Sequence, residues 1–320
     1  MGTQNTGQYT VLDNMNVDGA FRNALRPEGT WAFDAAYYNA DSNSATEVYA
    51  MLGQLPAMRK SDGGLVFKEL DKYSLSIPNE DYDASIQMRL ADLRRDKTGQ
   101  LLQRIQQLGI RARTHWNKLA ADLITNGTTD LSFDGVAFYS ASHAFGSNTY
   151  SNLLTSSDYS ALNVVTATAP TADEAADALV YLTGHFDTYV DEAGEPIWED
   201  DATYQILCGT AAMKAAFEIA LTSDTLTSGT TNPARGLRDR VRLIYTPRLS
   251  SLTTQIVINR ISGDPIMRPF VLQQEVAPEL KQPAENDSAV ITSGKTFVAA
   301  TTTRGAGYGF PTESIHATFS

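Results

Sequence analysis

Three side chains near the middle of the chain are of the types that serine hydrolases use. Ser142 and His143 are adjacent, and Asp134 lies upstream of both. A hydroxyl, an imidazole and a carboxylate form a proton relay only where their side chains converge. No G-x-S-x-G motif surrounds the serine, and neighbouring residues on a strand point to opposite faces. The pattern therefore favours a structural turn. A hydrolase is kept as an alternative, which a serine-reactive probe on Ser142 would test.

The remaining reactive side chains are dispersed along the chain. The spacing of the four histidines fits no common zinc-binding motif; they are His115, His143, His185 and His316. The single cysteine, Cys208, stands in an apolar run, which is typical of a thiol packed in the core. The acidic residues 199–201 are interpreted as solvated charge, with a divalent-ion site as the alternative. The glycine-rich run 305–309 is interpreted as a bend or bulge in a terminal strand, because no helix follows it. We therefore expect no catalytic residue, no cofactor and no metal.

The chain has 320 residues and a net charge of −12, and its charges are unevenly distributed. Residues 89–118 contain eight basic and two acidic residues, a net charge of +6, whereas residues 171–201 contain ten acidic residues and no Lys or Arg. Opposite patches of this kind steer association between copies and fix its register, although both segments could also be solvated faces. Arg104, Arg111 and Lys118 recur every seven residues. This basic face is expected to meet either a neighbouring subunit or, non-specifically, the phosphates of DNA.

Apolar residues between positions 98 and 126 have the period of a long amphipathic helix. They recur every three or four residues, at Leu101, Ile105, Leu108, Ala112, Trp116, Leu119 and Leu123. Shorter helices are predicted from Ser44, at 171–190, where Thr171 and Glu174 have capping-box spacing, and at 210–222. Strands are predicted at 131–140 (a hairpin turning at Asp134-Gly135), 240–247, 255–261, 270–276 and 296–303. No stretch approaches the roughly 20 apolar residues of a membrane helix. The mixed order of helices and strands indicates an α+β fold.

Two segments near the start of the chain lack a core of their own and are not expected to fold stably by themselves. Residues 1–30 are polar and rich in Gly and Asn, which is typical of an arm. Residues 54–90 alternate apolar and polar positions between turn signals, which predicts an extended hairpin. A lone hairpin is marginal in water, so both segments are expected either on neighbouring copies or on the parent domain. The residues predicted to contact another subunit are Leu65, Phe67, Tyr73, Leu75, Ile77 and Arg89.

An ordered set of short motifs carries a resemblance to a known family. The first group comprises Asn79, Asp83–Leu93, Asp96–Gly99, Leu108-Gly109, Leu119–Gly127, FDGVAFYSASH (133–143) and Asn152-Leu153. The second group comprises residues 204–224, Asn232, 240–250, 264–278 and 293–319. In this order they resemble the Mu-like phage major head subunit, and the similarity covers residues 60–320. No single motif is specific, but the order of the whole set is.

The resemblance implies the Hong Kong 97-type capsid fold. Its parts would be an N-terminal arm (1–53), an extended hairpin loop (54–90), a peripheral domain (91–169) with a spine helix (97–126), an axial domain (170–275) and return strands to the peripheral domain (276–320). It also implies a structural major capsid protein, not an enzyme, that assembles as hexamers and pentamers into an icosahedral shell around phage double-stranded DNA. Portal and scaffold or decoration proteins are the further partners implied, without a membrane. The expected location is the virion, after synthesis in the bacterial host cytoplasm. An encapsulin-like compartment or another phage structural protein is the alternative.

Overall fold

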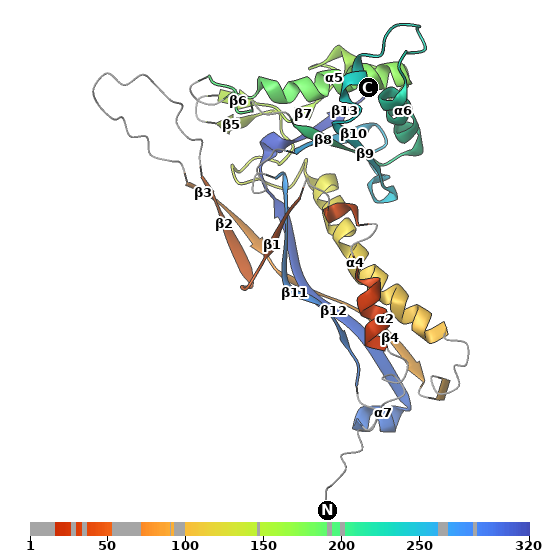
Figure 1. The fold of residues 1–320 in the computed structure, drawn as a ribbon. Coiled ribbons are helices and arrows are strands. Elements are labelled where there is room, and N and C mark those ends of the chain that lie inside the picture. Colours follow the sequence, from red (N-terminus) through yellow and green to blue (C-terminus); the bar gives the residue numbers. More distant parts are fainter. Residues whose placement is uncertain are drawn as a thin grey trace, which may run out of the picture.

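The computed structural model has an elongated lower part and a wider upper part (Figure 1). It describes residues 17–26, 30–33, 37–52, 72–89, 91–92, 100–145, 148–190, 194–198, 202–261, 268–283 and 287–320. Helices and strands are intermingled along these residues, which confirms the predicted α+β class. Within the described residues, no helix combines the length and the apolar character needed to span a bilayer.

Helix α4 (Gln100–Asn126) is the long axis of the lower part, and it confirms the helix predicted from the apolar period. Ile105, Leu108 and Trp116 on its apolar stripe are buried. Helix α2 (Val17–Ala24) packs against it, where a Cβ at Gly109 would lie 2.8 Å from the Cβ of Ala24. The glycine therefore lets the two helices approach closely, which offsets its low helix propensity.

A four-stranded sheet runs alongside α4. Its order is β1-β11-β12-β4, built from β1 (Tyr37–Asp41), β11 (Phe270–Lys281), β12 (Lys295–Tyr308) and β4 (Glu80–Arg89). The short helix α7 (Ser288–Ser293) joins β11 to β12. One face of this sheet packs on α4, and Phe21, Ile105 and Val298 lie in the core between them. The pairs β1–β11 and β4–β12 join residues more than 200 positions apart, so this sheet holds the N-terminal and C-terminal parts of the chain together.

A five-stranded sheet forms the upper part together with α5 (Ala172–His185) and α6 (Ala211–Thr222). Its order is β7-β13-β10-β8-β9, built from β7 (Leu153–Leu154), β13 (Ser314–Thr318), β10 (Gln255–Ile261), β8 (Thr203–Cys208) and β9 (Val241–Tyr245). Thr171 caps α5 in the predicted capping box with Glu174. Cys208 is buried in the core of this part, as predicted, and burial raises the pKa of its thiol to about 11.

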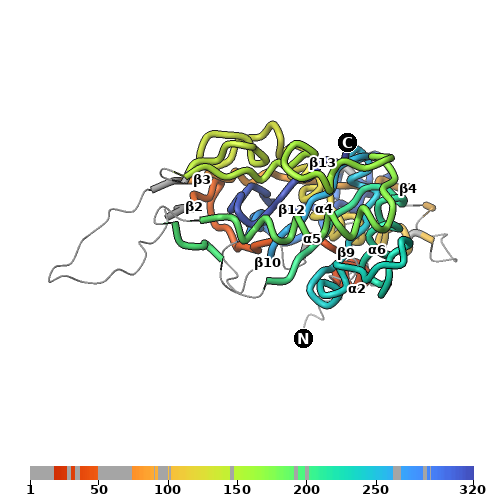
Figure 2. The backbone as a smooth tube through the Cα atoms, turned by 90° about the horizontal axis from the view of Figure 1, so that it is seen from above, coloured from red at the N-terminus to blue at the C-terminus, as the bar shows by residue number. Residues whose placement is uncertain are grey.

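Two small two-stranded sheets complete the described strands. One pairs β2 (Thr46–Leu52) with β3 (Lys72–Pro78), and the other pairs β5 (His143–Phe145) with β6 (Asn148–Tyr150). Single 3-10 turns link the elements, at Trp31–Phe33, Ser160–Leu162, Phe186–Thr188, Pro233–Leu237, Pro247–Leu249 and Pro311–Glu313. Seen from above, β2 and β3 lie at one side of the molecule (Figure 2).

Several predictions about elements are wrong. The segment from Ser44 forms strand β2 and not a helix, because its residues pair with β3. The expected strands at 131–140 reduce to one bridge between Leu131 and Ala137, although the turn at Gly135 is present with φ of 82°. Strand β13 lies in the upper sheet, so residues 276–320 do not all return to the lower part.

The arm and the hairpin also differ from what the sequence suggested. Residues 17–24 of the arm fold onto α4 of their own chain, with Phe21 1% exposed. The hairpin predicted at 54–90 pairs β3 with β2, while β4 leaves it and pairs with β12. The turn at Asn79 separates the two strands, so each continues in a different sheet.

Candidate assembly site at the base of the β2–β3 ribbon

The paired strands β2 and β3, called the β2–β3 ribbon below, form a two-stranded sheet that is separate from both larger sheets. Seven residue pairs, from Thr46↔Pro78 to Leu52↔Lys72, hold it together. Val48 on this ribbon is 65% exposed. Because a two-stranded sheet is marginal on its own, its stability must come from where it joins the rest of the chain and from whatever covers it.

Gln273 of β11 forms hydrogen bonds to both strands at the base of the ribbon. Its amide nitrogen donates to the carbonyl oxygen of Ile77 at 3.0 Å and to Oδ1 of Asn79 at 2.9 Å. Its amide oxygen accepts a hydrogen bond from the hydroxyl of Tyr49 at 2.9 Å. Burial raises the pKa of Tyr49 to about 12, so the phenol keeps its proton and remains a donor. Gln273 is fully buried, and its three hydrogen bonds therefore fix the direction in which the ribbon leaves the body.

Asn79 closes the same base from the opposite side. Its amide nitrogen donates to the hydroxyl of Ser42 at 2.6 Å and to the carbonyl oxygen of Ser44 at 2.8 Å. Its backbone N–H donates to the carbonyl oxygen of Ala45. Asn79 thereby joins the start of β2 to the end of β3, a structural role for the asparagine on which the family resemblance partly rests.

Two glycines of the run 305–309 make room for this base. A Cβ at Gly305 would lie 2.5 Å from the carbonyl oxygen of Pro78 and 2.8 Å from the amide nitrogen of Gln273. A Cβ at Gly307 would lie 2.5 Å from Cδ1 of Ile77. All three distances are shorter than real Cβ atoms show, so only glycine fits at these positions without movement of its neighbours. The run continues β12 without a break up to Tyr308, which corrects the predicted bend or bulge: its glycines serve close packing.

The residues predicted to contact another subunit differ in how far they are exposed in the structure. Leu65 and Phe67, and the side chain of Tyr73, lie outside the described residues. Leu75 is half-buried and Arg89 is exposed, so both remain predictions. Ile77 is only 2% exposed and packs under β12 of its own chain. Its assignment to an inter-subunit contact is therefore wrong, because its side chain is already covered.

The predicted basic face is present on α4. Arg104, Arg111 and Lys118 are all exposed on this helix, while Arg113 turns toward α2 and donates to the carbonyl oxygens of Ala24 and Arg26. The acidic residues 199–201 lie outside the described residues. Among the residues that are described, no group of three or more histidine, cysteine or carboxylate side chains is placed to hold a metal ion.

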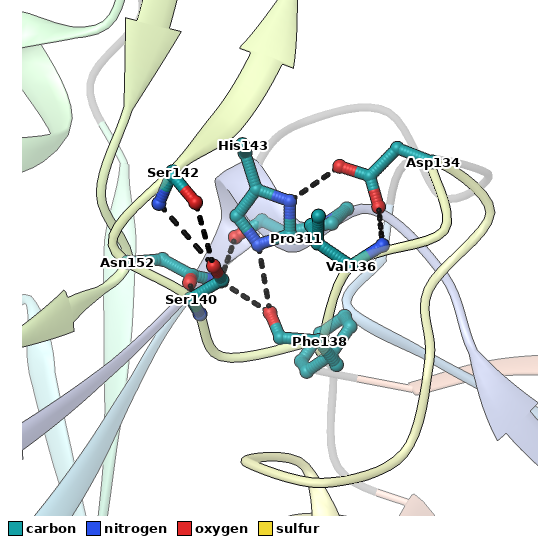
Figure 3. A network of polar contacts seen from close by, with 8 residues as sticks. All are labelled: Asp134, Val136, Phe138, Ser140, Ser142, His143, Asn152 and Pro311. Atoms are coloured by element: carbon teal, nitrogen blue, oxygen red, sulfur yellow. Dashed lines mark hydrogen bonds and ion pairs between the residues drawn. The ribbon is translucent and has the colours of Figure 1, made fainter.

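The Ser–His–Asp residues form a structural network and not a proton relay (Figure 3). His143 is fully buried, with Nδ1 2.6 Å from Oδ2 of Asp134 and Nε2 3.1 Å from the carbonyl oxygen of Phe138. A carbonyl oxygen only accepts, so Nε2 carries a proton and cannot take one from a hydroxyl. Ser142 instead lies against Ser140, with the two hydroxyls 3.4 Å apart. The geometry therefore contradicts the hydrolase alternative.

Asn152 completes this network and ties it to the C-terminal segment. Its amide nitrogen donates to the carbonyl oxygens of Phe138 and Pro311, at 2.8 and 3.1 Å, and its amide oxygen accepts from the backbone N–H of Ser140 at 2.8 Å. It is fully buried. The loop that follows α4 is thus held against the end of the chain by an asparagine and a histidine–carboxylate pair.

Sequence reasoning missed Gln273 and the packing role of Gly305 and Gly307. A single glutamine inside a strand has no distinguishing spacing, because its partners lie about 190 to 220 positions away. The glycine run 305–309 is visible in the sequence, but turns, bulges and close backbone contacts all produce such a run, so the pattern alone does not distinguish them. Only the pairing of β11 with β12 brings these residues to the ribbon.

Solved capsids share this arrangement of elements. The procapsid chain of bacteriophage JBD30 matches 96% of this chain and 74% of its own length, at 16% identity and a TM-score of 0.52. The capsid chain of cyanophage P-SCSP1u matches 89% of this chain and 87% of its own length, at 12% identity and a TM-score of 0.59. The fold is therefore that of the Hong Kong 97-type phage capsid subunits, as predicted.

The sequence adds a match to one family within this class. The model of the Mu-like prophage major head subunit gpT matches residues 13–171, so this part of the chain is similar to that family. The FluMu prophage major head subunit of Haemophilus influenzae (strain ATCC 51907 / DSM 11121 / KW20 / Rd) is 26% identical over 107 residues. That alignment spans 33% of this chain and about a third, 35%, of the relative's length.

Proposed function

We propose that this chain is a major capsid protein that assembles with copies of itself into the head shell of a phage. The match of residues 13–171 to the major head subunit family carries the proposal. The capsid fold supports it across nearly the whole chain. The chain would work by binding copies of itself, as hexamers and pentamers, around double-stranded DNA. Portal, scaffold and decoration proteins would be its other partners, and the shell would form in the bacterial host cytoplasm.

The β2–β3 ribbon supports the same proposal on physical grounds. It is clamped at its base by Gln273 and Asn79, yet Val48 on it remains 65% exposed. The unpaired edges of a two-stranded sheet and its uncovered face are a surface on which another copy can pack. A second copy that packs on the ribbon would supply the additional surface that a two-stranded sheet needs.

Light scattering and negative-stain microscopy of the purified chain test the proposal. We expect closed shells of uniform size, and a chain that stays monomeric at all concentrations and salt conditions would contradict it. Val48→Asp should block assembly while α4 stays folded, and the isosteric Val48→Thr serves as the matched control. Extraction of the contents separates two kinds of shell. DNA inside the particles fits a virion, whereas a protein cargo would indicate an encapsulin-like compartment.

A further inference from the structure

The groove between α4 and the strands β4 and β12 has two oppositely charged halves. The first half, a cavity of about 310 Å³, is lined on α4 by Arg111, His115 and Lys118. The second half, of about 200 Å³, is lined by Glu80, Asp122 and Asp130. Tyr82 lines both halves, so the two cavities adjoin at this residue. We call these the basic half and the acidic half of the α4 groove.

A buried cation lies beneath the basic half. Arg304 is fully buried, and its guanidinium stacks 4.4 Å from the centre of the Trp116 ring. It donates to the hydroxyl of Thr302 at 2.9 and 3.2 Å and to the carbonyl oxygen of Ala112 at 3.3 Å. Both acceptors belong to residues that line the basic half. Among the described residues, no ion pair to Arg304 is found. A buried charge without a counter-ion is costly, so an anion in the groove above it would be stabilised.

Positive charges also surround His115, which lines the basic half. Burial lowers the pKa of Arg304 to about 10, so it stays charged at neutral pH. Burial, together with the charges of Arg304, Lys118 and Arg248, lowers the pKa of His115 to about 4. The imidazole is therefore neutral at pH 7 and does not add to the charge. Asp83 is the one acidic side chain on the lining of the basic half.

We propose that the α4 groove receives an extended segment of a second copy of this chain, with an acidic side chain in the basic half and a basic side chain in the acidic half. This inference rests on the proposed function and names one of its contacts. Lys118 and Asp122 are one helical turn apart, about 6 Å, and Arg111 and Asp122 are about 16 Å apart along the axis. At about 3.3 Å per residue of extended chain, the two charges of the incoming segment would be about two to five residues apart.

DNA fits this groove less well than protein does. A duplex presents an unbroken row of phosphates, one negative charge per roughly 1.7 Å of its axis. Phosphates over Arg111 and Lys118 would continue over Glu80, Asp122 and Asp130, which would repel them. A peptide segment can carry both signs within a few residues, so alternating charge selects protein over nucleic acid and also fixes its direction.

Charge reversal within the groove tests the proposal. The double variant Arg111→Glu/Lys118→Glu should raise the protein concentration needed for assembly at least about tenfold, because like charges would then face each other across the interface. Arg104→Glu is the matched control, since Arg104 is exposed on the same helix but lines neither half of the groove. Asp122→Lys, in the acidic half, should impair assembly in the same way. Helical circular dichroism of the unassembled variants checks that α4 is intact, and Arg111→Gln/Lys118→Gln replaces the double variant if it fails to fold.

Each result separates this inference from the proposed function. If the double variant assembles like the wild type, the inference is overturned while the shell remains. If its shells form normally but retain less DNA, and Arg104→Glu shows the same loss, the basic face meets DNA and the inference is again overturned. If the wild-type chain forms no particles, the proposed function itself fails.

Discussion

Replacement of Gln273 with leucine tests whether this buried glutamine sets the position of the β2–β3 ribbon. Leucine keeps a similar size but removes three hydrogen bonds, to Tyr49, Ile77 and Asn79. At about 1 kcal/mol each, these bonds contribute about 3 kcal/mol, and the carbonyl of Ile77 also loses its side-chain donor. We therefore expect the free energy for local opening of the ribbon to fall by about 3 kcal/mol, roughly a hundredfold in the opening equilibrium.

Hydrogen exchange of the unassembled chain measures this effect directly. Amides of residues 46–52 and 72–77 should exchange about a hundredfold faster in Gln273→Leu, while the amides of α4 change little. Gln274→Leu is the matched control. The side chain of Gln274 is only partly buried, and among the described residues it makes no side-chain hydrogen bond. Unchanged exchange in the ribbon of Gln273→Leu would refute the assigned role of Gln273.

Three further predictions concern buried contacts. Gly307→Ala should destabilise the chain by about 1–3 kcal/mol through collision with Ile77, and Ile77→Ala in the same chain should recover part of that loss; strictly additive effects would count against the contact. Burial lowers the pKa of His316 to about 4 from an ordinary value of 6.5, so between these pH values the unfolded chain binds a proton that the folded chain does not. The free energy of unfolding should therefore fall as the pH drops from 6.5 to 4. His316→Phe should flatten this part of a urea-unfolding pH series, and an unaltered slope would exclude His316 as its source. His143→Ala should cost about 3–5 kcal/mol because it removes the buried imidazole partner of Asp134, whereas Ser142→Ala should cost under about 0.5 kcal/mol. Labelling of Ser142 by a serine-reactive probe would contradict this interpretation.

Local sequence patterns predicted α4, α5 and α6 well because the determinants of these helices lie close together in the chain. The apolar period of α4 spans about six turns, and the pair Thr171 and Glu174 fixes the start of α5 within four residues. Strands β9, β10 and β12 were also placed near their observed positions. In each case the residues that define the element are also the residues that form it.

Strand pairing was harder to predict because it depends on distant partners. β3 and β4 are adjacent in sequence and alternate as a hairpin should, yet they pair with β2 and β12 respectively. A polar segment such as residues 17–24 shows no core pattern until α4 and Gly109 provide a surface for Phe21. The candidate site shows the same limit, since Gln273 acquires its role only when β11 reaches the base of the ribbon.

An electron cryomicroscopy reconstruction of the assembled particle tests the central proposal most directly. It should show a closed shell in which the β2–β3 ribbon lies on a neighbouring copy and the side chain of Val48, 65% exposed in the single chain, is covered. A particle in which Val48 faces solvent in every copy would contradict the proposed role of the ribbon. A chain that never forms a shell would contradict the function itself.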